Sequence, residues 1–170
     1  MFSPNIHHMK RLIVPVILLA VFFCSCKQSA RFSIIPKIEF VDLEKIANNY
    51  NYDDKANLTF YFQDGDGDIG LEGNISPSDT LPEQKYNLFI NYYEKQNGQF
   101  VKIDSVNNNA RIPYLSNNVP ESIEGEITYE IYINNYLSPY DTVYFDFYIV
   151  DRAHHRSNTV RTPEIIIKKR

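Results

Sequence analysis

The residues with the clearest chemical potential are three aspartates in one short segment, FYFQDGDGDIGLEG, residues 60–73. Asp64, Asp66 and Asp68 alternate with glycines directly after an aromatic, strand-like run. Carboxylate oxygens that converge from a short loop are typical ligands of Ca²⁺, which takes about six to eight oxygens. Glycine lets a backbone curl enough for alternate side chains to meet. The spacing therefore makes a calcium site one interpretation of this loop.

The same residues exclude an EF-hand, which requires Gly at the sixth position of its loop and Glu at the twelfth. Counting from Asp64, those positions hold Ile69 and Ile75. The competing interpretation is structural. Asp-Gly pairs form tight turns whose carboxylates cap backbone N–H groups, and Arg152 or Arg156 would neutralise them through salt bridges. The sequence favours this structural interpretation and keeps calcium as the alternative.

The elements that must position this loop read as β-strands. Leu58, Phe60 and Phe62 alternate with polar residues, and the same period of two recurs along the chain, which is typical of strands with one wet face. The 13 Tyr and 11 Phe residues also favour strands. Asn97-Gly98 indicates a hairpin, and Pro163 an edge position or a bulge. The expected strands lie within residues 37–43, 56–62, 85–95, 99–106, 124–133, 141–151 and 158–169.

About seven strands in this length predict a single immunoglobulin-like antiparallel β-sandwich over residues 37–170. A small closed barrel is the competing architecture. In the sandwich, the loop after the second strand lies at the same end as the loop before the last strand, DRAHHRSN, residues 151–158. We therefore expect Asp151 to approach Asp66 or Asp68. If the loop binds calcium, the ligand set is Asp64, Asp66, Asp68 and Asp151.

The N-terminus has the pattern of a lipoprotein signal. Met9-Lys10-Arg11 is followed by an apolar run over 12–23 and by CSCK at 24–27. The run has the length of a signal core and is short for a permanent membrane helix. We expect residues 1–25 to be removed, because the small Ser25 precedes Cys26, and a lipid to be attached to Cys26. Residues 26–36 would form the tether, and Met9 is a more typical signal start than Met1.

No cysteine follows Cys26 in the sequence, so we expect no disulfide in the exported domain. The thiol of Cys26 is then best explained as the site of lipid attachment. The competing interpretation is an uncleaved N-terminal anchor with two incidental cysteines.

Four segments together resemble a group of uncharacterised Bacteroidota lipoproteins: FQDGDGDIGL, YNLFINYYEKQNGQF, IEGEITYEI and DRAHHRSNTVRTPEI. That family has a Phe-x-Asp-Gly-Asp-Gly-Asp signature and an Asp-Arg-Ala-Gly ending, where this chain has His154 in place of the glycine. The resemblance covers most of residues 37–167. It implies an immunoglobulin-like fold and no activity. In the resemblance to lipoprotein signals, Lys27 stands in place of the aspartate that retains many lipoproteins at the inner membrane, which implies an outer-membrane location. No acidic run follows Cys26, which favours the periplasmic face over the cell surface.

Composition and motifs limit the function further. The net charge of -4 argues against nucleic acid as a partner, and the sequence has no Gly-x-Ser-x-Gly, His-Glu-x-x-His or phosphate loop. Neighbouring His154 and His155 are interpreted as surface residues. We expect a non-catalytic structural or interaction module, held at the membrane by lipid, with an envelope protein or a glycan as partner. One alternative is a glycan- or peptide-binding protein, stabilised by calcium, and another is an unrecognised hydrolase. The tyrosines available for such binding are Tyr92, Tyr93, Tyr144 and Tyr148.

Overall fold

A computed structural model describes residues 31–115 and 121–169. The expected signal segment 1–25 and Cys26 lie outside the described residues. In the described part, the elements are β1 (Lys37–Ala47), β2 (Asp53–Asp64), a one-turn helix α2 (Pro82–Lys85), β3 (Leu88–Gln96), β4 (Gln99–Lys102), β5 (Ile123–Tyr132), β6 (Thr142–Ile149), β7 (Val160–Arg161) and β8 (Ile165–Ile166).

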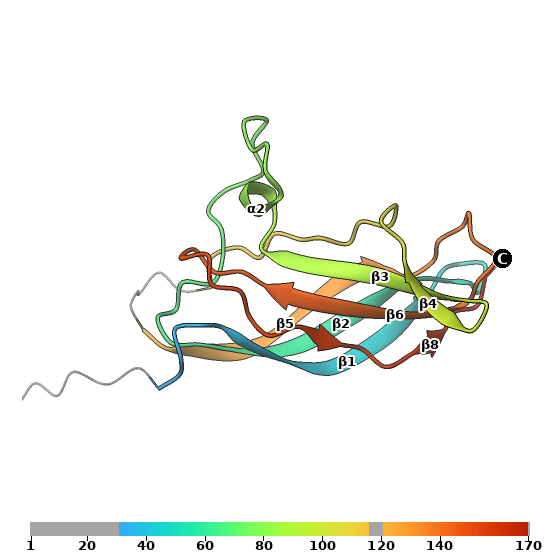
Figure 1. The fold of residues 1–170 in the computed structure, drawn as a ribbon, viewed down its shortest axis with the longest axis horizontal. Coiled ribbons are helices and arrows are strands. Elements are labelled where there is room, and N and C mark those ends of the chain that lie inside the picture. The colour runs from blue at the N-terminus through green and yellow to red at the C-terminus, as the bar shows by residue number, and fades with distance from the viewer. Residues whose placement is uncertain (1–30, 116–120, 170) are drawn as a thin grey trace, which may run out of the picture.

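The strands form two antiparallel sheets, which Figure 1 shows as two layers. One sheet has the order β1-β2-β5, and the other has the order β4-β3-β6-β7, with β8 also pairing with β6. These orders correspond to strands A-B-E and C′-C-F-G of an immunoglobulin-like sandwich. The predicted fold class is confirmed, and the closed barrel is wrong.

The core forms where the inward residues of the two sheets meet. Alternate residues of β2, β3 and β6 are buried because successive side chains of a strand point to opposite faces. Phe60 of β2 packs against Phe147 of β6, with ring centroids 5.4 Å apart. The fully buried side chains of this core include Ile38, Leu58, Phe60, Leu88, Tyr92, Ile131, Ile133, Phe145, Phe147 and Ile149.

Two details depart from simple alternation along a strand. The register of β1 shifts between Phe40 and Asp42, so Leu43 and not Asp42 follows Phe40 in packing against the core. The polar side chain of Asn87 is 2% exposed, and it accepts a hydrogen bond from the N–H of Ile112 and donates one to the C=O of Ile112. The last predicted strand divides into β7 and β8 on either side of Pro163, as its bulge signal indicated.

One end of the sandwich gathers segments that are far apart in the sequence. In Figure 1, residues 31–36, the loop after β2 and the loop after β6 all lie at the left end. Among the described residues, no helix has both the length and the apolar character needed to cross a membrane. The acidic loop after β2 and the loop after β6, which begins near Asp151, thus share one end of the domain with residues 31–36.

The packing of β6 against β2 predicts that Phe147→Ala destabilises the fold by about 3–5 kcal/mol, because it leaves a cavity opposite Phe60. Leu137→Ala is the matched control, since Leu137 is 96% exposed, and it should change stability by less than about 0.5 kcal/mol. Equilibrium unfolding in urea measures both values, and equal effects would contradict this packing.

Candidate cation site

The acidic loop begins inside the sheet. Asp64 is the last residue of β2 and pairs with Ile123 of β5, so its backbone position is fixed by the ladder. Gly67 has a positive φ of 70°, and a Cβ there would lie 2.2 Å from the backbone oxygen of Glu121. Only glycine fits this close approach. The turn carries Asp68 back toward the strand end that holds Asp64.

Three carboxylates converge at this end of the sandwich. Asp64, Asp68 and Asp151 each offer one oxygen, and these oxygens lie within 4.8 Å of one another. Ca²⁺ binds oxygens at about 2.3–2.6 Å, so two ligands of one ion can be at most about 5 Å apart. The spacing therefore fits a shared Ca²⁺. Asp151 follows β6, which belongs to the other sheet, so the cluster joins the two layers.

Within the loop, the aspartates use one oxygen for the fold and leave another without a partner. Asp64 Oδ2 accepts a hydrogen bond from the N–H of Asp68 at 2.9 Å, and Asp68 Oδ2 accepts one from the N–H of Ala153 at 3.1 Å. The Oδ1 atoms of Asp64, Asp66 and Asp68 are buried and have no hydrogen-bond partner within residues 31–115 and 121–169. Asp64 as a whole is 0% exposed. Buried carboxylate oxygens without partners are costly, and a bound cation would supply the missing partner.

Asp151 is held in place by the turn that follows it. It is 2% exposed. Its Oδ1 accepts the N–H of His155 at 2.7 Å, and its Oδ2 lies 2.9 Å from His155 Nδ1. The turn places His154 at a positive φ of 66°, the left-handed conformation that glycine adopts at no cost. The chain thus keeps a glycine-type turn here without a glycine. His154 is exposed as expected, whereas His155 orients Asp151.

The salt bridges expected from Arg152 and Arg156 are not formed within the described part of the chain. The guanidinium of Arg152 lies 4.3 Å from the ring centroid of Tyr114. That of Arg156 lies 3.7 Å from the Tyr148 ring and donates to Thr159. The carboxylates of Asp64 and Asp68 do cap backbone amides, as the structural interpretation predicted, but the residue that meets them from the far loop is Asp151 and not an arginine. Calcium binding stays a prediction.

The crowding of these acids changes their proton affinity. Burial, followed by the charges of Asp66 and Asp68, raises the pKa of Asp64 to about 6. The pKa of Asp68 is also raised, first by burial and then by the charge of Asp151, although the N–H of Ala153 and the charge of Arg152 oppose the shift. Like charges that are held together and out of water disfavour ionisation, and a bound cation would reverse this penalty.

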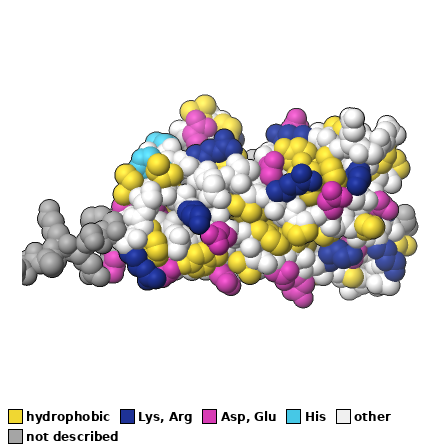
Figure 2. Space-filling model, turned by 60° about the horizontal axis from the view of Figure 1, so that its bottom comes forward, with side chains coloured by type: hydrophobic (Ala, Val, Ile, Leu, Met, Phe, Trp, Pro, Cys, Tyr) yellow, Lys and Arg dark blue, Asp and Glu magenta, His cyan; other side chains and the backbone are white. Residues whose placement is uncertain are grey.

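The tyrosines available for ligand binding already contact other side chains of the domain. Tyr92 is fully buried, contrary to the expectation that it is exposed, and its hydroxyl donates to the buried Glu94. Tyr93 stacks on Tyr144 with centroids 4.5 Å apart, and the Arg161 guanidinium lies 3.5 Å from the Tyr144 ring. Figure 2 shows one face of the molecule, on which hydrophobic side chains are interspersed with charged ones. The cross-strand pairing of these rings is a structural use.

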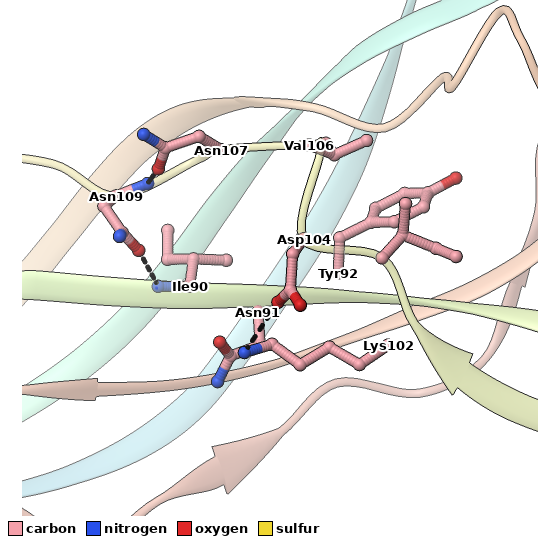
Figure 3. Close-up of a pocket in the computed structure, with 9 residues that line it drawn as sticks. Ile90, Asn91, Tyr92, Lys102, Asp104, Val106, Asn107 and Asn109 are labelled. Atoms are coloured by element: carbon pink, nitrogen blue, oxygen red, sulfur yellow. Dashed lines mark hydrogen bonds and ion pairs between the residues drawn. The ribbon is translucent and has the colours of Figure 1, made fainter.

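A hollow of about 250 Å³ lies beside β3 and β4 and is shown in Figure 3. Polar side chains that line the hollow form hydrogen bonds or ion pairs with neighbouring residues. Asn109 Oδ1 accepts the N–H of Ile90, and Lys102 Nζ lies 3.0 Å from Asp104 Oδ1. Asn91, on the same wall, donates to Asp146. This arrangement gives no support to the hydrolase alternative.

The comparisons with known proteins add nothing to this geometry, because no family model, no curated protein and no solved structure matches the chain.

The raised pKa of Asp64 predicts a pH dependence of stability in calcium-free buffer. An unfolded aspartate titrates near about 3.9, so between about pH 4 and 6 the folded state binds more protons than the unfolded state. The free energy of stabilisation that this extra proton binding contributes is fully present below the unfolded pKa of Asp64 and is lost as the pH rises through its folded pKa. Its size is on the order of 2–3 kcal/mol. Asp64→Asn should therefore gain stability relative to the wild type when the pH rises from about 4 to 7.5.

Urea unfolding of both proteins at the two pH values measures this difference. Asp104→Asn is the control, because the Asp104 side chain is 84% exposed. A difference between wild type and Asp64→Asn that does not change with pH would contradict the burial of an uncompensated carboxylate.

Proposed function

We propose that this protein is a lipid-anchored, non-catalytic module of the cell envelope whose β-sandwich is stabilised by a bound Ca²⁺ ion. The observation that carries the cation site is the convergence of Asp64, Asp68 and Asp151 together with buried, unpartnered Oδ1 atoms in the loop. The partner of the module would be another envelope protein or a glycan, as expected from the sequence.

The ligand chemistry favours calcium among the common cations. The cluster consists of carboxylates, which are hard oxygen donors, whereas zinc sites mostly contain imidazole and thiolate ligands. Asp66 is not one of the three clustered carboxylates, although it lies in the same loop and its buried Oδ1 also lacks a hydrogen-bond partner among the described residues. Ca²⁺ tolerates irregular geometry and accepts backbone oxygens and water as further ligands. Mg²⁺ is a poorer fit, because it demands a near-ideal octahedron at about 2.0–2.1 Å.

The position of the cluster favours a stabilising role. Asp64 and Asp68 belong to the loop after β2, and Asp151 belongs to the loop after β6 in the other sheet. An ion shared by these carboxylates would cross-link the two sheets at one end. A domain without internal disulfides gains stability from such a link, because the ion binds the folded state and not the separated loops.

The envelope location rests on the N-terminal pattern. The apolar run over 12–23 and Ser25-Cys26 support processing before Cys26 and lipid attachment to its thiol. Lys27 stands where an inner-membrane retention signal would have aspartate, which supports the outer membrane, and the lack of an acidic run after Cys26 supports a domain that faces the periplasm.

Calcium should raise the thermal midpoint of unfolding at pH 7.5. At about one hundred times its dissociation constant, a ligand of the native state contributes about 2.7 kcal/mol, or on the order of 10 °C in Tm for a domain of this size. The measurement is a melting curve in excess CaCl₂ and in excess EGTA. Asp64→Asn and Asp68→Asn should lose most of the shift, because each removes a converging charge.

Asp104→Asn is the control for this experiment, since its side chain is exposed and paired with Lys102, and it should keep the full shift. MgCl₂ should give a smaller shift than CaCl₂. An unchanged midpoint in calcium would sink the proposed cation site.

Cys26→Ser should move the protein from the membrane fraction to the soluble fraction, because the serine hydroxyl cannot accept the thioether-linked lipid. Cell fractionation followed by immunodetection measures this, and Cys24→Ser is the matched control that should stay membrane-bound. Retention of Cys26→Ser in the membrane fraction would refute the anchor assignment.

A further inference from the structure

The last residues of the expected tether lie on the acidic loop instead of standing free. The N–H of Arg31 donates to Ser122 Oγ at 2.9 Å, and Ser122 Oγ donates to the backbone oxygen of Gly65 at 3.0 Å. One serine hydroxyl thus joins the incoming chain to the loop. The side chain of Arg31 adds an ion pair of 2.8 Å with Glu124.

The contact between the two backbones is close. A Cβ built on Gly65 would lie 2.4 Å from the oxygen of Phe32 and 2.6 Å from that of Ser33. No other residue type fits between Asp64 and Asp66 without displacing the incoming segment. Phe32 is half-buried and Pro36 is buried, so this segment packs as part of the domain.

The surface that receives Phe32 and Ser33 is the same stretch of backbone that carries the carboxylates. Gly65 connects Asp64 with Asp66, whose Oδ1 atoms are both buried and unpartnered. Without a cation, repulsion among Asp64, Asp68 and Asp151, which each place one carboxylate oxygen within 4.8 Å of the others, favours spreading of the loop. A cation that holds the loop curled would hold the receiving surface in the shape that fits the segment.

We infer that Ca²⁺ at the aspartate loop locks residues 31–36 against the sandwich and thereby sets how far the domain stands from its membrane anchor. This inference rests on the proposed function, since it assumes the cation site and gives it a regulatory role. The coupling is reciprocal: calcium favours docking of the segment, and docking raises the affinity for calcium by the same factor.

The number of residues between Cys26 and the domain limits how far the domain can stand from its lipid anchor. A fully extended chain spans at most about 3.3–3.6 Å per residue. With the segment docked, the chain from Cys26 to Arg31 reaches about 17 Å, whereas release up to Pro36 extends the reach to about 34 Å. Calcium occupancy would therefore halve the distance over which the lipid-anchored domain can search for a partner.

Hydrogen exchange of the full-length protein, followed by mass spectrometry, tests the lock. In excess calcium, peptides that cover residues 31–35 should exchange at least about ten-fold more slowly than in EGTA, in line with a typical allosteric coupling. A peptide from β6, in the middle of its sheet, is the internal reference. The calcium-dependent Tm shift is recorded on the same samples.

Two variants separate the lock from the cation site. Ser122→Ala removes the hydroxyl bridge and leaves all four aspartates, so it should keep a calcium-dependent Tm shift and lose most of the protection at 31–35. Gly65→Ala should do the same by steric displacement of Phe32.

If calcium raises the Tm of the wild type and leaves exchange at 31–35 unchanged, the lock is wrong and the cation site stands. If calcium changes neither the Tm nor the exchange at 31–35, both the cation site and the lock are wrong. If Ser122→Ala and Gly65→Ala both keep full protection, the docking contacts are not the means of coupling, and the lock is overturned.

Discussion

The burial of Asp64 at the end of β2 is the constraint on which this end of the structure depends. Its position is fixed by pairing with β5, and it is fully removed from solvent. A carboxylate in such a place must be protonated, hydrogen-bonded or matched by a cation. One of its oxygens accepts a hydrogen bond from the N–H of Asp68, and the other has no hydrogen-bond partner among the described residues. Asp68 and Asp151 each place an oxygen within 4.8 Å of one from Asp64.

Asp64 and Asp68 both shape the turn and supply oxygens for the proposed cation. One oxygen of each of Asp64 and Asp68 caps a backbone amide and so shapes the turn. One oxygen of each of these residues also lies within 4.8 Å of one from Asp151. Because the capping bonds already fix the side chains, a cation would meet ligands that need little reorganisation on binding. The glycines contribute by admitting neighbouring backbone, with Phe32 at Gly65 and Glu121 at Gly67.

The proposed cation thus connects three parts of the chain in one place: the end of β2, the loop after β6 and the segment that enters from the N-terminus. Sandwich cores, here the packing of Phe60 against Phe147, hold two sheets face to face but leave the loops at their ends to local interactions. A bound ion at the end where residues 31–36 join the domain would supply both the local stability and a means of control.

The sequence by itself determined the strands, the sandwich and the acidic character of the loop, because alternation of side chains and Asp-Gly turns are local properties of neighbouring residues. It also placed Asp151 at the right end, since strand order follows from the fold class. The tertiary structure decided which side chain meets the aspartates. Arg152 and Arg156, one and five residues after Asp151 in sequence, lie instead over the rings of Tyr114 and Tyr148. The bulge at Phe40/Asp42 and the burial of Asn87 were likewise beyond local patterns. These outcomes depend on register and on partners across the fold, which no periodicity in one segment contains.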